Sequence, residues 1–184
     1  MRYAMAIDTR KCVGCSDCVV ACQLENNVPV GFCRDWVTES VHGSYPNVEL
    51  EIRSERCNHC ENAPCVRCCP TGASHIVEGG IVLVTGNKCI GCGACIQSCP
   101  YDARYSHPEG YVDKCTFCHH LVSKGGEPAC VAVCPTKCMY FGDLDDPNSK
   151  VSNALKNRKF KVLAPEAGTN PQIYYLIQPL YNWI

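Results

Sequence analysis

The spacing of its cysteines constrains this chain more than any other feature. Nineteen of the 184 residues are cysteine, and sixteen of these fall into four sets of four. Spacing this tight and regular indicates that the fold gathers thiols around bound metal, because disulfide frameworks carry no such fixed repeat. Two sets share the pattern C-x2-C-x2-C-x3-C: Cys12, Cys15, Cys18 and Cys22 in one, and Cys89, Cys92, Cys95 and Cys99 in the other.

The other two sets keep the outer steps of this pattern and carry insertions in the middle. Each begins with C-x2-C and ends with C-x3-C-P, and the segments between the second and third cysteines have four and eleven residues. A single C-x2-C step would mean little, but four complete sets indicate metal ligation. The members are Cys57, Cys60, Cys65 and Cys69 in one set, and Cys115, Cys118, Cys130 and Cys134 in the other.

The uninterrupted pattern is the ligand run of bacterial ferredoxins, whose fourth cysteine binds the other cluster of a pair. Three thiolates on one tight loop bind three irons of a [4Fe–4S] cluster. We expect the fourth cysteine to begin a helical segment and to point away, so that a second motif supplies the missing ligand. The sequence therefore predicts sixteen cluster ligands and four [4Fe–4S] clusters.

Zinc is the main alternative use of these cysteines. A zinc ribbon could combine Cys57 and Cys60 with a later pair, and His59, His119 or His120 could be extra ligands. Zinc sites, however, need neither a triple-cysteine loop nor a trailing C-x3-C-P step. We therefore interpret the three histidines as ordinary polar residues beside the clusters.

Some residues near the motifs have two possible roles. Three cysteines outside the four sets could sense redox state or act as alternative ligands, but we interpret them as small buried apolar residues. Four basic residues that flank the motifs could raise cluster potentials, but surface charge for solubility is the interpretation we favour. These residues are Cys33, Cys68 and Cys138, and Arg67, Lys88, Arg104 and Lys114.

Charge and hydropathy exclude several classes of protein. The formal net charge is −1, and each oxidised cluster with its four thiolates adds about two negative charges. No basic stripe is present, so nucleic-acid binding is not expected. Residues 1–8 predict a strand rather than a secretory signal, and no stretch reaches the length of a membrane helix. If the protein works outside the cytoplasm, something else must carry it there.

The fold class predicted is α+β, with two ferredoxin modules that bind two clusters each. Residues 74–85 predict a hairpin around Gly79-Gly80, and the second and third motifs flank it. We assign residues 53–112 to a central module. Residues 1–52 with 113–147 form a discontinuous second module, which contains an insertion at 27–50 with short strands at 36–38 and 48–52.

Two further segments lie outside the motif cores. Residues 119–129 fill the fourth motif and predict a surface loop. Residues 148–184 form a C-terminal extension, which we interpret as a partner-docking tail with a weakly helical start. Its apolar end, residues 171–184, must bury itself on a partner, on a membrane interface or on the body of the chain itself.

All four cysteine sets are complete, so no iron is expected to be open to a substrate. This favours one-electron relay, with no catalytic residue in the chain. Four clusters suggest a path for electrons between two separate redox sites.

The order of the motifs, CVGCSDCVVAC, CNHCENAPCVRCCP, CIGCGACIQSCP and CTFCHHLVSKGGEPACVAVCP, resembles the four-cluster iron–sulfur (beta) subunit of molybdopterin enzymes of the dimethyl sulfoxide reductase family. RYAMAID, CPYDARY and FGDLDDP make the chain especially similar to the polysulfide/thiosulfate reductase beta subunits. The resemblance covers about residues 1–147.

The resemblance implies a pairing of the ligands in which each cluster takes its fourth thiolate from another motif. The order runs from the molybdopterin side to the membrane quinone side. The implied sets are Cys89, Cys92, Cys95 with Cys69; Cys57, Cys60, Cys65 with Cys99; Cys115, Cys118, Cys130 with Cys22; and Cys12, Cys15, Cys18 with Cys134.

The resemblance also implies partners and a location. The partners are a molybdopterin catalytic subunit with molybdenum or tungsten and a membrane anchor subunit. The location is the extracytoplasmic face of the membrane, after export with a partner that carries a twin-arginine signal; a cytoplasmic location is the alternative. Beta subunits of nitrite-, arsenate- or dimethyl sulfoxide-linked reductases and a stand-alone soluble polyferredoxin remain alternatives.

Overall fold

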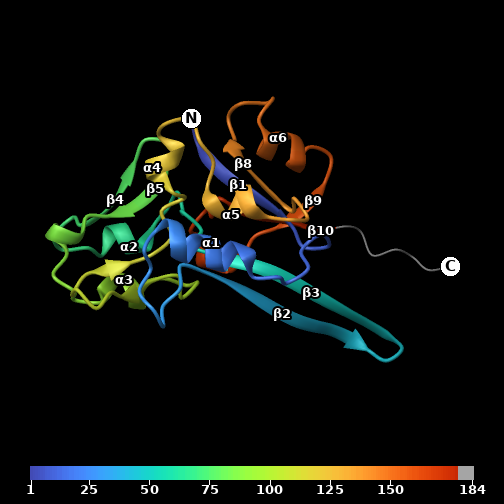
Figure 1. The fold of residues 1–184 in the computed structure, drawn as a ribbon, viewed down its shortest axis with the longest axis horizontal. Coiled ribbons are helices and arrows are strands. Elements are labelled where there is room, and N and C mark those ends of the chain that lie inside the picture. The colour runs from blue at the N-terminus through green and yellow to red at the C-terminus, as the bar shows by residue number, and fades with distance from the viewer. Residues whose placement is uncertain (178–184) are drawn as a thin grey trace.

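A four-stranded sheet forms the cysteine-poor part of the protein in the computed structural model, which describes residues 1–177 (Figure 1). Its strands are β1 (Tyr3–Asp8), β8 (Met139–Asp143), β9 (Lys159–Lys161) and β10 (Ile173–Ile177), in the order β8-β1-β10-β9. β10 is parallel to β1, and β8 and β9 are antiparallel to their neighbours. The two ends of the described chain therefore meet in one sheet.

The predicted N-terminal strand is confirmed, and both of its faces are buried. Helix α6 (Lys150–Leu155) covers one face, where Ala4 and Ala6 contact Val151. The other face carries Met5 and Ile7 into the main core. Strands covered on both faces are apolar at every position rather than at alternate ones.

The first part of the predicted docking tail packs on its own chain. Ile173, Tyr175 and Leu176 of β10 are fully buried in the sheet core. The extension also contains the predicted helix, as α6, together with β9 and a short 3-10 turn at Pro165–Ala167. Residues 178–184 lie outside the described part of the chain, so the docking interpretation stays a prediction for them.

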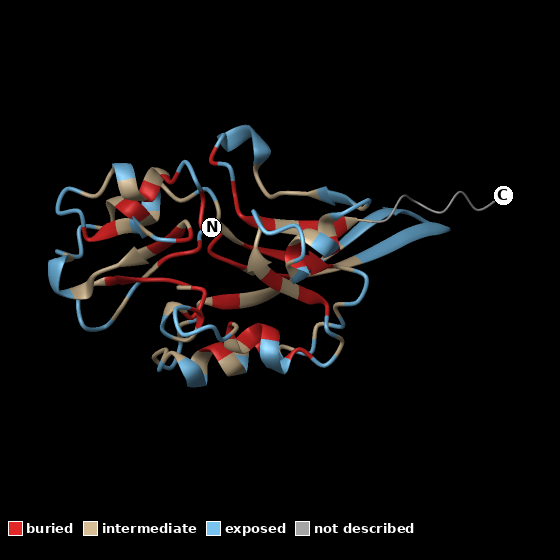
Figure 2. Cartoon of the chain, turned by 90° about the horizontal axis from the view of Figure 1, so that it is seen from above, coloured by how far each residue is buried: buried red, intermediate tan, exposed pale blue. Residues whose placement is uncertain are grey.

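The insertion before the second motif is one long hairpin rather than several short strands. β2 (Asp35–Ser44) and β3 (Asn47–Arg56) pair antiparallel along their whole length. The far end of this hairpin extends away from the body and is exposed, whereas its base is buried (Figures 1 and 2). The sequence prediction was too short because the strands continue through exposed residues, where no buried face marks their length. β3 also crosses residue 53, where we placed a module boundary.

The cysteine motifs lie on short helices and loops beside two small hairpins. β4 (Ser74–Val77) pairs with β5 (Ile81–Val84), which confirms the predicted hairpin, and β6 (Tyr105–Ser106) pairs with β7 (Val112–Asp113). The helices are α1 (Asp17–Glu25), α2 (Pro64–Arg67), α3 (Ala94–Gln97), α4 (His119–Val122) and α5 (Ala129–Val133), with a 3-10 turn at Gly86–Lys88.

Two expectations about these motifs were wrong. The fourth cysteine of a motif does not begin a helix: Cys22 lies within α1, and Cys69, Cys99 and Cys134 follow α2, α3 and α5. The proline after each of these last three disfavours helical conformation in the preceding cysteine. The predicted loop at 119–129 also begins with α4, and only its later residues form a turn.

No helix within residues 1–177 is long and apolar enough to cross a membrane.

Gly79, in the turn between β4 and β5, fixes that hairpin against the main sheet. Its φ is +79°, its carbonyl accepts from the Tyr3 N–H at 2.8 Å, and an added Cβ would lie 2.4 Å from the Tyr3 ring. We expect Gly79→Ala to lower the free energy of unfolding by about 2–4 kcal/mol, as the sum of a left-handed backbone cost and overpacking. Denaturant unfolding of the iron-loaded protein measures this.

Gly80→Ala is the matched control for this substitution. Gly80 has a similar φ of +75°, but an added Cβ there would meet only the Arg2 side chain at 4.0 Å. Its cost should be limited to the backbone contribution, about 1–2 kcal/mol. Equal losses in the two variants would contradict the role given to the Tyr3 contact.

Candidate metal centres

Cys22 joins the fourth motif around one cavity. Its lining includes Cys22, Cys115, Cys118 and Cys130, although Cys22 is 93 positions away from Cys115 in the sequence. The packing of α1 on α5 brings these segments together. Asn26, at the end of α1, donates from Nδ2 towards the Sγ atoms of Cys22 and Cys118 at 3.6 and 3.7 Å. This is one of the sets that the resemblance implies.

A second cavity joins the first motif to the end of the fourth. Its lining includes Cys12, Cys15, Cys18 and Cys134. Cys138 lies in the same lining, and its Sγ is 3.4 Å from Cys134 Sγ. The structure therefore places five thiols here, four of which form another implied set.

The third group combines the second motif with the end of the third. Burial, together with the nearby Cys57, Cys65 and Cys99 thiols, raises the pKa of the Cys60 thiol to about 11. Burial also raises the pKa of Cys65, with Cys57 and Cys99 again adding to the shift. These four cysteines influence one another electrostatically because they converge, and they too form an implied set.

The fourth implied set is only partly assembled by the contacts of the described residues. Burial raises the pKa of Cys95, and the thiols of Cys68 and Cys89 add to it. The Sγ of Cys69 instead accepts from the Ser74 N–H at 3.4 Å. Cys92 is exposed. The structure thus brings Cys89 and Cys95 together and places Cys69 on the neighbouring turn.

Exposure differs between the four groups. Cys15 of the first motif and Cys92 of the third are the exposed members of the predicted ligand set. The groups formed around Cys57 and around Cys115 contain only buried or half-buried thiols. Two groups therefore reach the surface and two lie inside.

Three buried cations lie among the thiols. Arg56, Arg104 and Lys114 are 1%, 6% and 1% exposed. Arg56 Nη1 donates to Cys130 Sγ at 3.0 Å, and Arg104 Nη2 donates to Cys65 Sγ at 2.9 Å. Lys114 Nζ donates to the carbonyl oxygens of Val82 and Cys115. The sequence prediction of surface charge was therefore wrong for Arg104 and Lys114, whereas Arg67 and Lys88 are exposed as expected.

Sequence reasoning missed Arg56 and its partner Asp35. They form a buried ion pair at 3.0 Å between the bases of β2 and β3. Ser54 donates to Asp35 Oδ1 at 3.0 Å, and its Oγ is 3.3 Å from Cys18 Sγ. The only signal in the sequence was that Arg56 directly precedes Cys57. This position does not distinguish a buried arginine from an ordinary charged residue at the end of a strand.

The donor set fits negatively charged iron–sulfur clusters. Within residues 1–177 neither Arg104 nor Lys114 forms an ion pair with a carboxylate. Burial lowers the pKa of the Lys114 ammonium, and the thiols of Cys57, Cys115 and Cys65 oppose that shift. A buried cation without a counter-charge is costly. Clusters held by these thiolates would supply the missing negative charge.

His59 is packed in the interior rather than in a solvated position. It is fully buried, its ring stacks on Phe117 with centroids 3.8 Å apart, and its Nδ1 accepts from the Val82 N–H. Burial, followed by the positive charge of Lys114, holds its pKa well below the usual value. The ring is therefore neutral. His120, by contrast, is exposed and pairs with Glu25 at 2.8 Å.

The three cysteines outside the four sets have different environments. Cys138 is buried, as predicted, and Cys68 is half-buried beside Ser98 at 3.3 Å. Cys33 is exposed, so the prediction of a buried apolar residue was wrong there. Its position just before β2 places it on the surface.

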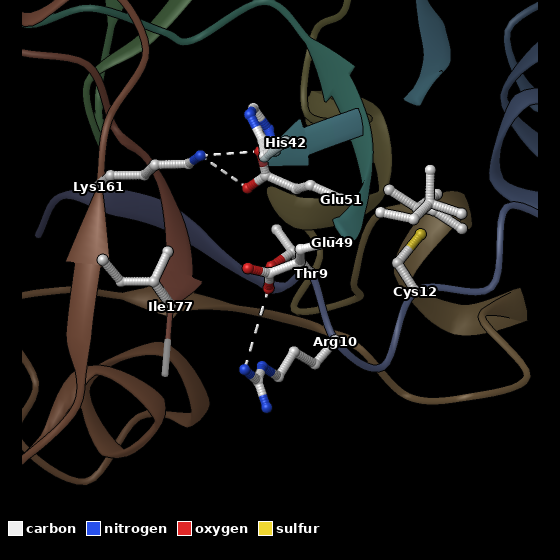
Figure 3. Close-up of a pocket in the computed structure, with 10 residues that line it drawn as sticks. Thr9, Arg10, Cys12, His42, Glu49, Glu51, Lys161 and Ile177 are labelled. Carbon is white, nitrogen blue, oxygen red and sulfur yellow. Dashed lines mark hydrogen bonds and ion pairs between the residues drawn. The ribbon is translucent and has the colours of Figure 1, made fainter. Parts of the chain in front are cut away.

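Two other features bear on metal and ligand binding. Within residues 1–177, no three His, Cys, Asp or Glu side chains are placed to hold a single metal ion together; a cluster instead distributes its thiolates over several irons. A charged cavity lies beside Cys12 between β3 and β9 (Figure 3). Glu51 pairs there with Lys161 at 2.7 Å, and we assign this cavity no ligand.

Comparison with known proteins gives consistent relatives. Residues 48–144, more than half of the chain, match the family described as "4Fe-4S dicluster domain". The chain is 44% identical to a subunit of the tetrathionate reductase of Salmonella typhimurium, over 95% of this chain and 72% of that protein. It is 41% identical to a component of the polysulfide reductase of Wolinella succinogenes, over 94% and 93%. The arsenate respiratory reductase iron-sulfur subunit of a Shewanella species is 36% identical, over 96% of both chains.

Proposed function

The chain belongs to the 4Fe-4S dicluster family, and from its similarity to subunits of reductases for tetrathionate, polysulfide and arsenate we propose that it is an electron-transfer subunit. In this proposal it relays electrons between a molybdopterin catalytic subunit and a membrane quinone-linked subunit. The whole complex is a reductase of the polysulfide/thiosulfate type.

The exposure of the thiols supports a relay with two ends. Cys15 and Cys92 reach the surface in different groups, and the groups around Cys57 and Cys115 lie inside. One exposed group would face each redox partner, and the interior groups would connect them. This arrangement is what distinguishes a relay from a cluster that only stabilises the fold.

We propose four [4Fe–4S] clusters held by the sixteen cysteines in the four implied sets. They occupy two modules, residues 53–112 and residues 1–52 with 113–147. Each bound cluster supplies one-electron redox chemistry. The residues of the chain hold the thiolates, exclude water from the inner groups and place Arg56, Arg104 and Lys114 beside them.

The proposal assigns substrate chemistry to the partner. All four sets supply a complete complement of thiolates, so the chain keeps no iron open to a substrate. We place the complex on the extracytoplasmic face of the membrane. Reductases for other oxyanions and sulfoxides remain second candidates, because the relatives of this chain serve several substrates.

Co-purification tests the proposed partners. The protein, tagged and isolated anaerobically from its native host in detergent, should carry a molybdopterin subunit in stoichiometric amount together with a membrane subunit. Mass spectrometry identifies both, and their cellular fraction gives the location. A fully loaded monomer that repeatedly lacks both chains would contradict the relay and favour a stand-alone polyferredoxin.

A further inference from the structure

Arg104 lies near thiols that belong to two different proposed cluster sites. Its Nη2 donates to Cys65 Sγ at 2.9 Å, and its charge also interacts electrostatically with the Cys57 and Cys95 thiols. Cys65 belongs to the site around Cys57, and Cys95 to the site that reaches the surface at Cys92. Arg104 therefore lies at the junction of one inner site and one end site.

Among the described residues, the charge of Arg104 has no partner other than these sites. The side chain is 6% exposed, and its Nη2 also donates to the neutral Ser74 Oγ at 2.9 Å. Within residues 1–177, its Nη1 is buried and has no hydrogen-bond partner. A guanidinium stays protonated in proteins. A full positive charge with a free donor is therefore held between the two groups of thiols.

Arg56 shows the contrasting arrangement at the other end of the thiol array. It also donates to a motif cysteine, Cys130, at 3.0 Å, but Asp35 accepts from it at the same distance. The carboxylate offsets much of its charge. The uncompensated buried arginine is thus placed on the side of Cys92.

We propose that Arg104 sets the potentials of the two clusters held at Cys57, Cys60, Cys65, Cys99 and at Cys69, Cys89, Cys92, Cys95, making both easier to reduce. This rests on the ligand sets of the proposed function. Added electrons make a cluster more negative, so a nearby cation and hydrogen bonds to its sulfur ligands stabilise the reduced form. The effect favours electron movement from the Cys15 end towards the Cys92 end.

The test is an EPR-monitored redox titration of the intact, fully loaded protein. Arg104→Gln should lower the reduction equilibrium constants of two clusters at least about tenfold, which is about 59 mV for a one-electron couple. The other two clusters serve as internal controls and should keep their potentials. Four unchanged potentials would overturn the proposal.

Arg67→Gln is the matched control. Arg67 lies two positions from both Cys65 and Cys69, and removal of its charge is formally the same change. It is exposed and donates to Asn62 Oδ1 at 2.6 Å. Because solvent and salt screen exposed charge, this variant should change the reduction equilibrium constant of each cluster by no more than about twofold. Equal shifts in the two variants would show that burial of Arg104 is irrelevant.

Arg104→Lys covers the case in which Arg104→Gln does not load all its clusters. Lysine keeps the charge but lacks the planar fork that lets arginine contact two acceptors. The reduction equilibrium constant of at least one of the two clusters should then fall at least about threefold. Unchanged equilibrium constants for both clusters would again overturn the proposal. Iron and sulfide analysis of the unmodified protein separates failure of the proposed function from failure of the role given to Arg104. Fewer than four clusters in the unmodified protein would contradict the proposed function itself.

Discussion

Removal of iron is expected to abolish the cooperative unfolding transition of this protein. The core around the motifs contains few large apolar side chains. One group of packed, buried side chains there consists of Cys60, Cys65 and Cys95 with Ala63, Val82 and Val112. Without the clusters, the buried charges of Arg104 and Lys114 also lose their counter-charge. Metal-binding free energy in such sites is folding free energy. The metal-free chain should therefore lack a stable native structure around the cysteine motifs.

The loss should be uneven along the chain. One face of the sheet β8-β1-β10-β9 packs in a buried core without cysteines, which consists of Ala4, Ala6, Val151, Ala154 and Leu176. Hydrogen exchange followed by mass spectrometry should therefore show residual protection in β1 and β10 after iron removal. Protection in β4 and β5 should fall to the level of an unfolded peptide.

The control for this experiment is protein treated with the same chelator under conditions that leave the clusters intact. Iron and labile sulfide are assayed in each sample beside the thermal transition. A metal-free sample with an unchanged transition and unchanged protection would contradict a structural role for the clusters.

Paired cysteine substitutions are expected to be non-additive in a pattern that identifies the ligand sets. Cys22 and Cys118 line one cavity, and Cys15 lines another with Cys12, Cys18 and Cys134. Cys22→Ala with Cys118→Ala removes two ligands from one cluster and should change only that cluster. Cys22→Ala with Cys15→Ala should change two, with about four more irons lost when both clusters are lost completely.

Iron and sulfide analysis with EPR of the remaining clusters measures this outcome. The single variants are the reference, and Cys33→Ala is the control because this exposed cysteine lies outside the four sets. The opposite pattern, with Cys22 and Cys15 affecting one cluster and Cys22 and Cys118 affecting two, would mean that the first motif supplies all four ligands of its own cluster.

The four cysteine motifs, the first strand and the β4–β5 hairpin could be recognised from sequence because each depends on local chain geometry. A few residues between thiols determine how many can reach one cluster, and Gly79-Gly80 between two apolar runs determines a turn. Helix positions within the motifs were harder to predict, since turns of four or five residues carry no periodicity. The long β2–β3 hairpin was underestimated for a different reason: its far end is exposed, so no buried face marks how far the two strands extend.

The sequence by itself thus determined the cluster motifs and the family of the chain. Only the tertiary structure decided which charges matter: Arg67, Lys88, Arg104 and Lys114 look alike beside the motifs, but two are exposed and two are buried among thiols. It also brought β10 beside β1 and placed Arg56 on Asp35. Burial depends on distant segments that pack together, and the spacing of residues within a short motif holds no information about them.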